Sequence, residues 1–410
     1  MENIENKIPN GENQDTQNSS FFSENVSSSN GLEPKIRFVN FKENYRPLKI
    51  GDIYAERSEQ GAENMELLSV TINEGVKKRM DIDGKDTSSE DKSNYKIVHT
   101  GDMVYNSMRM WQGANGISDY DGIVSPAYTV LKSKGNIHNQ YIGFLFKNSE
   151  LINKFRKNSQ GLTSDTWNLK YPQIACIKIN IPSLDEQQKI ADFLSLVDQR
   201  IEKQRQLVES LKKYKRGYFQ RIISSLETSS FELKNIVDEY NAKSKIQNEF
   251  PILSSTLSGI KLQNDYFNKQ AASETTIGYK IVPFGYFTYR SMSDTGEFRF
   301  NLQNIIEKGI VSPAYPVFKV KEEYNAEFVE YILNETDNIK SQLLIKKEGG
   351  TRYALSFSKF QTLKIDLPIK NAQDKTVSQL RFINKVLTNE ERILSNLQKL
   401  KNGLLQQMFI

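Results

Sequence analysis

The sequence is poor in the residues on which most metal and catalytic sites depend. Its 410 residues include one cysteine, Cys176, and two histidines, His99 and His138. A single cysteine excludes a disulfide framework and a multi-cysteine metal site, and it is typical of a protein of the reducing cytoplasm. No glycine-rich phosphate loop is present, and neither histidine is accompanied by the partners of a catalytic triad. We therefore expect no metal, no cofactor and no catalytic residue.

Long apolar runs are also missing. No run approaches the roughly 18 residues of a membrane-spanning helix, and the N-terminus lacks a basic segment followed by an apolar core. We therefore expect no membrane span, no secretion and a cytoplasmic location. Residues 1–33 hold six acidic residues and one basic residue, and they contain almost nothing to bury. They are predicted to form a disordered polar tail.

The most informative stretch runs from residue 187 to residue 222, where apolar residues recur in alternating steps of three and four. This average spacing of 3.5 is typical of a helix that pairs with another helix along a continuous seam. At about 1.5 Å per residue the helix is roughly 54 Å long, so it needs a partner of similar length. The seam consists of Ile190, Leu194, Val197, Ile201, Gln204, Val208, Leu211, Lys215, Tyr218 and Ile222.

A second seam lies 186 positions further on, and its polar interruptions coincide with those of the first. Gln204 corresponds to Glu390, and Lys215 corresponds to Lys401. A polar residue in a seam weakens the pair but fixes its register, so we interpret the agreement as an internal duplication rather than two unrelated long helices. The predicted helix-pairing residues are Leu194, Val197, Ile201, Val208 and Leu211 in the first helix and Leu380, Ile383, Leu387, Leu394 and Leu397 in the second.

The segments before the two helices repeat as well. YKIVHTGDMVYNSM at 95–108 corresponds to YKIVPFGYFTYRSM at 279–292, and GIVSPAYTVLKS at 122–133 corresponds to GIVSPAYPVFKV at 309–320. Each segment reads as short strands with one helical stretch, at 139–157 or 328–343. The predicted fold is α+β, with two duplicated mixed α/β domains separated by two long antiparallel coiled-coil helices in pseudo-twofold symmetry. The predicted boundaries are a tail at 1–33, domains at 34–183 and 227–369, and helices at 184–226 and 370–410.

The loops after the duplicated YKIV strands are candidates for reading DNA bases. In the first half, Arg109, Trp111, Gln112 and Asn115 lie close together on a glycine-rich connection. Arginine can read guanine, glutamine and asparagine can read adenine, and tryptophan can stack on a base or sugar. The corresponding loop of the second half carries Arg290 and Arg299 instead. The alternatives are an ordinary surface loop and, for Trp111, a place in the core.

A second pair of loops precedes the final strand of each half. Thr163 in the first loop and Lys346, Lys347 and Arg352 in the second lie beside glycines. These side chains suit phosphate contacts, which add affinity and little sequence choice. The tetrapeptide Ser-Pro-Ala-Tyr at 125–128 and 312–315 is identical in the two halves, so we interpret it as structural.

The charge of the chain is concentrated on the two long helices. The stretch 184–226 carries nine basic and six acidic side chains, and 370–410 carries seven and three. Two interpretations of this excess of basic side chains remain: helix faces that are exposed to solvent, and a frame that binds a polyanion.

Residues 34–410 resemble the specificity subunit of type I restriction–modification enzymes. The resemblance rests on PKIRFVNF at 34–41, on IPSLDEQQKIADFLSLVDQRI before and within the first helix, on KYKRGYFQRI at its end, and on the duplicated layout. The second copy of the helix entry, LPIKNAQDKTVSQLRFINKVL, lacks the EQQ run.

The resemblance implies two target-recognition domains that each read one half of a bipartite site in double-stranded DNA. It further implies that two methyltransferase subunits bind the helices and domains, that restriction subunits join them in the full complex, and that the chain itself is not an enzyme. Two rivals remain: a coiled-coil structural adaptor without DNA recognition, and an enzyme whose site is assembled from residues distant in sequence. Salt-dependent DNA binding separates the first rival from the main interpretation, and activity of the isolated chain would favour the second.

Overall fold

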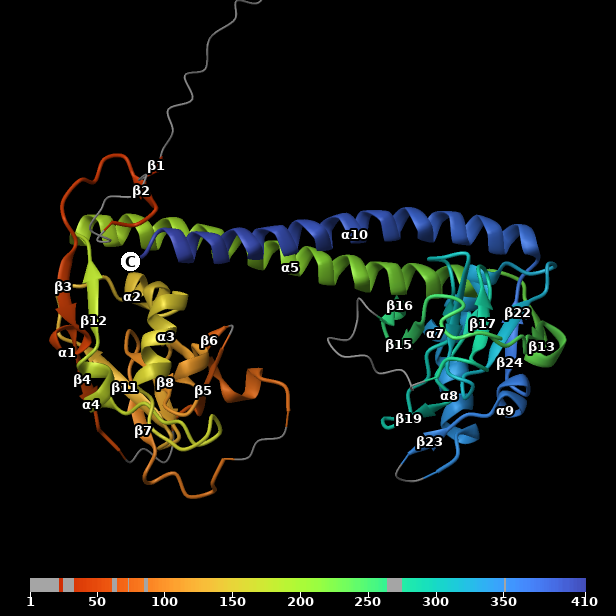
Figure 1. Cartoon of the computed structure of the whole chain (residues 1–410), viewed down its shortest axis with the longest axis horizontal. Coiled ribbons are helices and arrows are strands. Elements are labelled where there is room, and N and C mark those ends of the chain that lie inside the picture. Colours follow the sequence, from red (N-terminus) through yellow and green to blue (C-terminus); the bar gives the residue numbers. More distant parts are fainter. Residues whose placement is uncertain are drawn as a thin grey trace, which may run out of the picture. The chain divides into compact units, whose positions relative to one another are not determined.

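The computed structural model describes residues 22–24, 33–60, 65–72, 74–84, 88–263, 275–349 and 352–410 (Figure 1). These residues form two compact units. Unit 1 combines Met1–Gln204 with Ile393–Ile410, and unit 2 consists of Arg205–Arg392. Each unit therefore contains a part of both long helices.

Unit 1 is built on a four-stranded antiparallel sheet in the order β4–β11–β8–β9. Its strands are β4 (Tyr54–Arg57), β11 (Tyr128–Ser133), β8 (Met103–Asn106) and β9 (Asn115–Ile117). Three antiparallel pairs flank it: β5 (Leu68–Thr71) with β6 (Gly75–Lys78), β7 (Lys96–Val98) with β10 (Gly122–Val124), and β3 (Arg46–Lys49) with β12 (Lys178–Ile181). The short helices are α1 (Ile50–Ile53), α2 (Asn139–Leu145), α3 (Ser149–Asn158), α4 (Tyr171–Ala175), η1 (Arg79–Asp81) and η2 (Met110–Gln112).

The alternation of side chains along β8 explains the layers of unit 1. Met103 and Tyr105 face the core formed with α2 and α3, whereas Val104 faces a separate core formed with the hairpin β5–β6 and the pair β7–β10. Successive residues of a strand point to opposite faces, so one sheet separates a helical layer from a layer of hairpins.

Unit 2 repeats the sheet, the flanking strand pairs and the main short helices of this plan, and it adds the pair β19–β23. Its sheet has the order β14–β22–β18–β20, with β14 (Val237–Glu239), β22 (Val317–Val320), β18 (Phe287–Thr288) and β20 (Asn301–Leu302). The other strand pairs are β15 (Leu253–Thr256) with β16 (Gly259–Leu262), β17 (Lys280–Pro283) with β21 (Lys308–Val311), β13 (Ser229–Glu232) with β24 (Lys364–Leu367), and β19 (Met292–Ser293) with β23 (Tyr353–Ala354). The helices are η3 (Leu233–Asn235), α7 (Ala326–Glu335), α8 (Asp337–Lys346) and α9 (Phe357–Gln361). The internal repeat is therefore present in the topology as well as in the sequence.

The helical stretch expected in each half is two helices rather than one. In unit 1 the break lies between α2 and α3, where the Asn148 side chain accepts hydrogen bonds from the backbone N–H groups of Glu150 and Leu151 and caps α3. In unit 2, Thr336 separates α7 from α8 in an extended conformation. Asparagine favours helix starts because its side chain bonds to the free N–H groups there. The Thr336 hydroxyl instead donates to the carbonyl of Ile332, in the last turn of α7.

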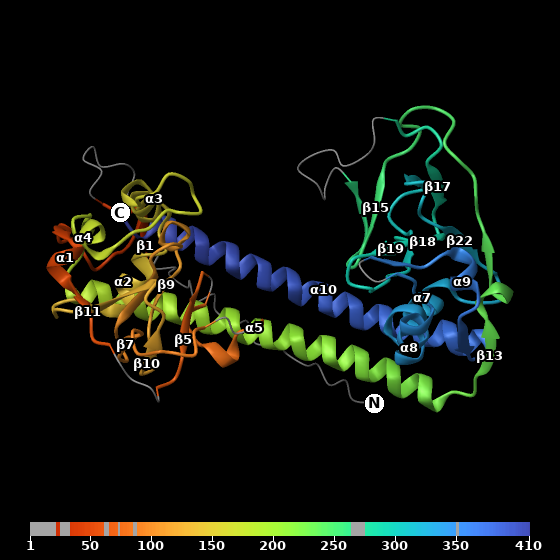
Figure 2. The ribbon, with the colours of Figure 1, turned by 90° about the horizontal axis from the view of Figure 1, so that it is seen from below.

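The long helices are α5 (Leu184–Ser225) and α10 (Lys370–Gln407). They lie side by side in each unit (Figures 1 and 2). In unit 1, Asp198 and Lys401 form an ion pair with an N···O distance of 2.5 Å. In unit 2, Lys212 approaches Glu391 to 3.4 Å, and Phe219 shares a core with Leu380. From Asp198 to Lys212 the residue numbers on α5 increase, while those of the partners on α10 decrease from Lys401 to Glu391. The two helices are therefore antiparallel.

All ten predicted helix-pairing residues are removed at least partly from solvent. Leu194, Ile201, Val208 and Leu380 are buried, as is the polar Gln204. The other six are half-buried: Val197, Leu211, Ile383, Leu387, Leu394 and Leu397. On α10 the two ends of the seam are the best covered, because there the helix also packs against the cores of the units.

The structure differs from the predicted disordered tail at three residues. Phe22–Glu24 form β1, which pairs antiparallel with β2 (Ile36–Phe38). The Phe22 ring contacts the rings of Phe38 and Phe193, with centroid distances of 4.8 and 5.4 Å. Burial of an aromatic ring stabilises this contact. Residues 1–21 and 25–32 of the predicted tail lie outside the described residues.

Candidate nucleic-acid interface

The two candidate loops of unit 1, which are far apart in the sequence, lie against each other. The first follows β8 and contains η2, and the second lies between α3 and α4. The Trp111 and Trp167 rings meet edge to face, with centroids 5.2 Å apart, and the backbone N–H of Leu169 donates to the carbonyl of Ser107 over 2.9 Å. Trp111 is half-buried, and its Nε1 donates to the carbonyl of Met108. Part of the indole is therefore already used in contacts within the protein.

The polar side chains of this surface differ in how far they are free to bind a ligand. Arg109 is exposed, and within the described part of the chain its guanidinium has no hydrogen-bond or ion-pair partner. Gln112 is half-buried at the end of η2. Thr163 is exposed in the second loop, where its backbone N–H donates to the Thr166 hydroxyl. Arg109 is therefore the most available hydrogen-bond donor of this loop pair.

The equivalent loops of unit 2 are joined through different contacts. Strands β19 and β23 pair across them, and the Arg352 guanidinium lies 3.0 Å from Asp294. The Lys347 ammonium lies over the Tyr353 ring, 3.9 Å from its centroid. A side chain at Gly296 would displace the Lys347 ammonium and crowd the Tyr353 ring, and the φ of +81° at this position also favours glycine. Both units therefore bring the same two loops together.

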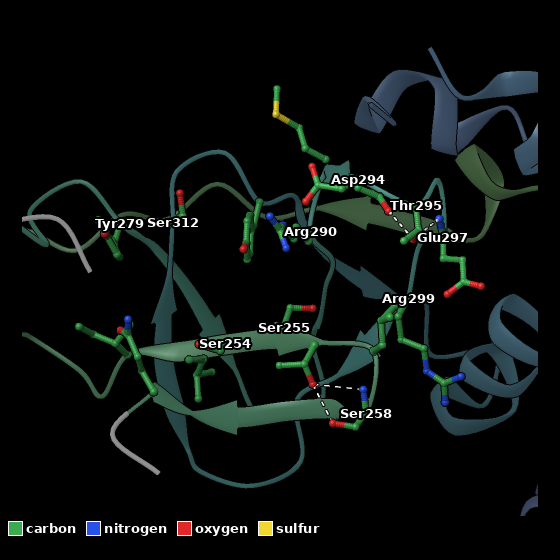
Figure 3. A pocket seen from close by; sticks show the side chains of 18 residues that line it. Ser254, Ser255, Ser258, Tyr279, Arg290, Asp294, Thr295, Glu297, Arg299 and Ser312 are labelled. Carbon is green, nitrogen blue, oxygen red and sulfur yellow. Dashed lines mark hydrogen bonds between the residues drawn. The ribbon is translucent and has the colours of Figure 1, made fainter. Parts of the chain in front are cut away.

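A hollow of about 690 Å³ separates the first loop of unit 2 from the hairpin β15–β16 (Figure 3). Serine and threonine side chains of the hairpin form one wall, and the loop from Arg290 to Glu297 forms the other. Arg290 points into the space between the walls, and no described residue accepts a hydrogen bond from its guanidinium. Hydroxyl groups around one unpaired arginine suit a polar, anionic ligand such as DNA.

Comparison with known proteins gives a family match for part of the chain. Residues 49–213 match the family model described as the type I restriction modification DNA specificity domain. Over this stretch the chain is similar to type I DNA specificity domains. The predicted resemblance to type I specificity subunits is thereby confirmed.

The related proteins agree with this assignment. The HindI specificity subunit of Haemophilus influenzae is 23% identical over 130 residues, a stretch that spans 30% of this chain and 28% of that protein. The solved S subunit of a type I restriction–modification system from M. genitalium has 13% identity and a TM-score of 0.54, with 92% of this chain and 99% of that chain covered. A chain from a structural study of complex assembly and conformational transition in the type I system has 14% identity and a TM-score of 0.54, covering 89% and 97%. At these identities the structural matches show the fold, and the predicted fold class is confirmed.

The prediction that Asn115 reads DNA bases is corrected by the structure. It is fully buried in β9, where its Nδ2 donates to the carbonyls of Gly113 and Phe146 at 3.2 and 3.4 Å. A side chain held in this way cannot reach a base edge. The strand β9 begins at Asn115, so the residue belongs to the sheet rather than to the exposed part of the loop.

Arg299 and Lys346 are also engaged within the fold. Arg299 lines the hollow, but its guanidinium points away from it in Figure 3 and bonds to Glu335 over 3.2 Å. Lys346 donates to the carbonyl of Thr362 over 3.2 Å. Arg352 is likewise paired with Asp294, and Lys347 lies over the Tyr353 ring. Arg290 is therefore the strongest candidate among the basic side chains of the unit 2 loops, and the other four are weaker candidates.

The identical Ser-Pro-Ala-Tyr segments form the same turn in the two units. The N–H of Tyr128 donates to the carbonyl of Ser125 over 2.9 Å, and the N–H of Tyr315 donates to that of Ser312 over 3.0 Å. The alanine carbonyl of each turn accepts a hydrogen bond from a serine of the adjacent loop. Ala127 accepts from the N–H of Ser107, and Ala314 accepts from the Ser291 hydroxyl. These hydrogen bonds connect each turn to the start of the first candidate loop of its unit.

The two sequence motifs that carry the resemblance meet in space. Arg37 of the PKIRFVNF segment donates to both carboxylate oxygens of Glu186 over 2.8 Å, and both side chains are buried. The hydrogen bond with Glu186 is the main reason that the pKa of Arg37 is raised. The Tyr45 hydroxyl also donates to Glu186. The glutamate of the EQQ run is thus used inside unit 1.

The next residue of that run has the same role in both units. The Gln187 amide donates to the carbonyl of Pro182 and accepts from the N–H of His138, which caps α2. Gln373 bonds in the same way to Pro368 and to Asn325, which caps α7. Each glutamine therefore fixes the start of a long helix to a short helix of its unit. The shared offset of 186 was the signal in the sequence that could have identified this pair.

The histidines are placed where neither completes a catalytic group among the described residues. His138 is the half-buried N-cap of α2. His99 is exposed between Glu59 and Asp121, at 3.7 and 3.6 Å. In the described part of the chain, no cluster of three or more histidine, cysteine or acidic side chains could hold a metal ion. No helix within that part is long and apolar enough to cross a membrane.

Proposed function

We propose that the chain is the DNA-recognition subunit of a cytoplasmic type I restriction–modification complex. Residues 34–183 and 227–369 act as target-recognition domains, and each reads one half of a bipartite site in double-stranded DNA. The helices α5 and α10 set the spacing between the half-sites and bind two methyltransferase subunits, which restriction subunits join in the full complex. The chain contributes recognition and carries out no chemistry itself.

One observation carries this proposal: the same scaffold presents a different set of side chains in each unit. The sheets have equivalent strand orders, and the Ser-Pro-Ala-Tyr turns have the same hydrogen bonds. The loops on this scaffold expose Arg109 beside a tryptophan pair in unit 1, and Arg290 beside Lys347 and Arg352 in unit 2. A structural adaptor has no reason to vary only the loops, whereas two readers of different sequences need this variation.

The experiment uses the chain together with its methyltransferase subunits and a library of random duplexes. Selection defines the preferred target, and binding is then measured for Arg109→Ala and for Arg290→Ala. Loss of a bidentate base contact costs about 1–3 kcal/mol, so each variant should lose preference at one half-site only, and the two variants should affect different halves.

Matched controls are available in the repeat. Lys178 and Lys364 are exposed at the first position of β12 and β24, and they correspond to each other. Their alanine variants should leave both half-site preferences unchanged. Equal loss of specific and random DNA in the Arg109 and Arg290 variants would contradict base reading, and a chain without any sequence preference would contradict the proposed function.

A further inference from the structure

In each unit, one side chain at the end of a short helix holds the backbone of the first recognition loop. In unit 1 it is Lys147, two residues after the end of α2, whose Nζ donates to the carbonyl of Gly113 over 2.6 Å. In unit 2 it is Asn334, in the last turn of α7. Its Nδ2 donates to the carbonyl of Phe300 over 2.8 Å, and its Oδ1 accepts from the N–H of Phe300 over 3.0 Å.

The two side chains occupy equivalent places in the repeat, and each holds backbone just before the same strand. The step from Lys147 to Asn334 is 187 positions, the same as the step between the helix caps His138 and Asn325. Gly113 lies two residues before β9, and Phe300 lies directly before β20. The two side chains differ in length, charge and chemistry, so an inherited contact between like residues does not account for the agreement. Both units therefore hold the backbone just before this strand, although the residues that hold it have changed.

Side-chain hydrogen bonds also connect these residues to the hairpin of each unit, β5–β6 in unit 1 and β15–β16 in unit 2. Lys147 also donates to the carbonyl of Ile72, directly after β5, over 2.9 Å. In unit 2 the residue next to Phe300, Asn301, donates to the carbonyl of Thr256, at the end of β15, over 2.9 Å. The helix end, the recognition loop and the hairpin are therefore linked by side-chain hydrogen bonds in both units.

We propose that Lys147 and Asn334 are positioning residues that hold each recognition loop against its hairpin, so that the loop side chains are presented to DNA in one conformation. This inference rests on the proposed function. Preorganisation of a binding loop reduces the entropy lost on binding, and it sharpens discrimination because a wrong base cannot be accommodated by movement of the loop.

Lys147→Met separates positioning from a merely structural role. Burial, and secondarily the nearby charge of Lys401, lowers the pKa of Lys147 to about 8, so its charged form is held at a cost. Methionine of similar length removes that cost, and the melting temperature should stay the same or rise. The carbonyl of Gly113 loses its charged donor in the same variant, so stability and recognition are expected to move in different directions.

The tryptophans give a direct readout. The chain has two, Trp111 and Trp167, and both lie in the loop pair of unit 1. Without DNA, Lys147→Met should make tryptophan fluorescence more accessible to acrylamide. Lys147→Arg keeps a charged donor and should behave like the original chain, and Asn334→Leu changes the other unit and should leave the signal unchanged.

Binding to the selected target completes the test. Discrimination should fall by about tenfold or more at the half-site read through Arg109 for Lys147→Met, and at the other half-site for Asn334→Leu. Unchanged discrimination and unchanged quenching would overturn the inference, and so would a lower melting temperature with equal loss on all DNA. If the unmodified chain has no sequence preference, the proposed function fails and the inference fails with it.

Discussion

At the scale of single residues, the Arg37–Glu186 pair is the contact on which unit 1 depends most clearly. A buried ion pair is costly to break, because the remaining charge is left without a partner. Glu186→Gln should therefore destabilise unit 1 by about 3–5 kcal/mol. Denaturation followed by tryptophan fluorescence measures this change, since both tryptophans lie in unit 1.

The control for this prediction is the double variant Arg37→Met/Glu186→Leu. It removes both charges, so it should recover most of the lost stability. Unit 2 has Ala372 at the equivalent position and should unfold as before. A single variant as stable as the original chain would mean that the pair makes no net contribution.

Buried tyrosines predict an alkaline limit to stability. Desolvation raises the pKa values of Tyr45, Tyr54, Tyr105, Tyr141 and Tyr289 above the ordinary value of 10.0. Above pH 10 the unfolded chain therefore loses phenolic protons that the folded chain keeps. The resulting stability is fully present below pH 10 and is lost as the pH rises beyond it.

Phenolate absorbance measures this effect during an alkaline titration. Part of the absorbance should appear reversibly, and the part from the five buried rings should appear only together with unfolding. Tyr54→Phe should reduce the second part. A single reversible titration of all 19 tyrosines without loss of structure would contradict the prediction.

The sequence indicated which polar residues lie in the candidate loops, but it indicated only partly which of their side chains are exposed. Arg109 and Arg290 are available as expected, because they lie in connections between strands. The burial of Asn115 was not predictable, because strand pairing places it in the core. The contact of Trp111 with Trp167 also depends on tertiary structure, since 55 residues separate them in the sequence.

At the scale of elements, periodicity was the most reliable guide to the fold. A seam repeated over many turns predicts a long paired helix, and α5 and α10 are such helices. Shorter patterns were less decisive. The runs at 139–157 and 328–343 are apolar enough for one helix each, but they contain Asn148 and Thr336, where the structure starts a new helix.

The C-terminal part of α10 and the residues after it should be essential for unit 1. Leu404, Leu405, Met408 and Phe409 belong to its core, so deletion of 373–410 removes them and also uncovers Leu194 and Ile201. An exposed apolar stripe drives association, and we expect the shortened chain to dimerise or aggregate. Sedimentation measures this, and a monomer with an unchanged thermal transition would contradict it.

A matched pair of point variants tests the same element more gently. Met408 is fully buried, and Met408→Ser should cost about 2–5 kcal/mol of stability. Leu400, within α10, is 54% exposed, and Leu400→Ser should change stability by roughly 0.5 kcal/mol or less.

At the scale of the whole molecule, the proposed function makes the helices a ruler between the half-sites. Insertion of seven residues after Gln204 and seven after Glu390 preserves a seam of 3.5 residues and adds about 10 Å to each helix. These points lie at or within two residues of the boundary between the units, so neither core is interrupted. The preferred gap should grow by up to roughly three base pairs, since DNA rises about 3.4 Å per base pair.

Selection from random duplexes measures the gap and the half-site sequences in one experiment. The half-sites should stay the same while the gap lengthens. An unchanged gap in a folded, DNA-binding variant would refute the ruler. Altered half-site bases would mean that the helices take part in recognition, and insertion into one helix alone serves as the control that breaks the shared register.

The composition of unit 1 from two separate parts of the chain has a consequence for biosynthesis. Arg205–Arg392 are translated between its two parts, and Asn148 bonds to the carbonyl of Leu405 across 257 positions of sequence. At roughly 5–20 residues per second, the ribosome needs on the order of 10–40 s to cross the intervening segment. During this time the nascent unit 1 has an unfilled core where Leu404 and Met408 will pack, whereas unit 2 is encoded without interruption. The half of the molecule that is synthesised first is thus the half that finishes folding last.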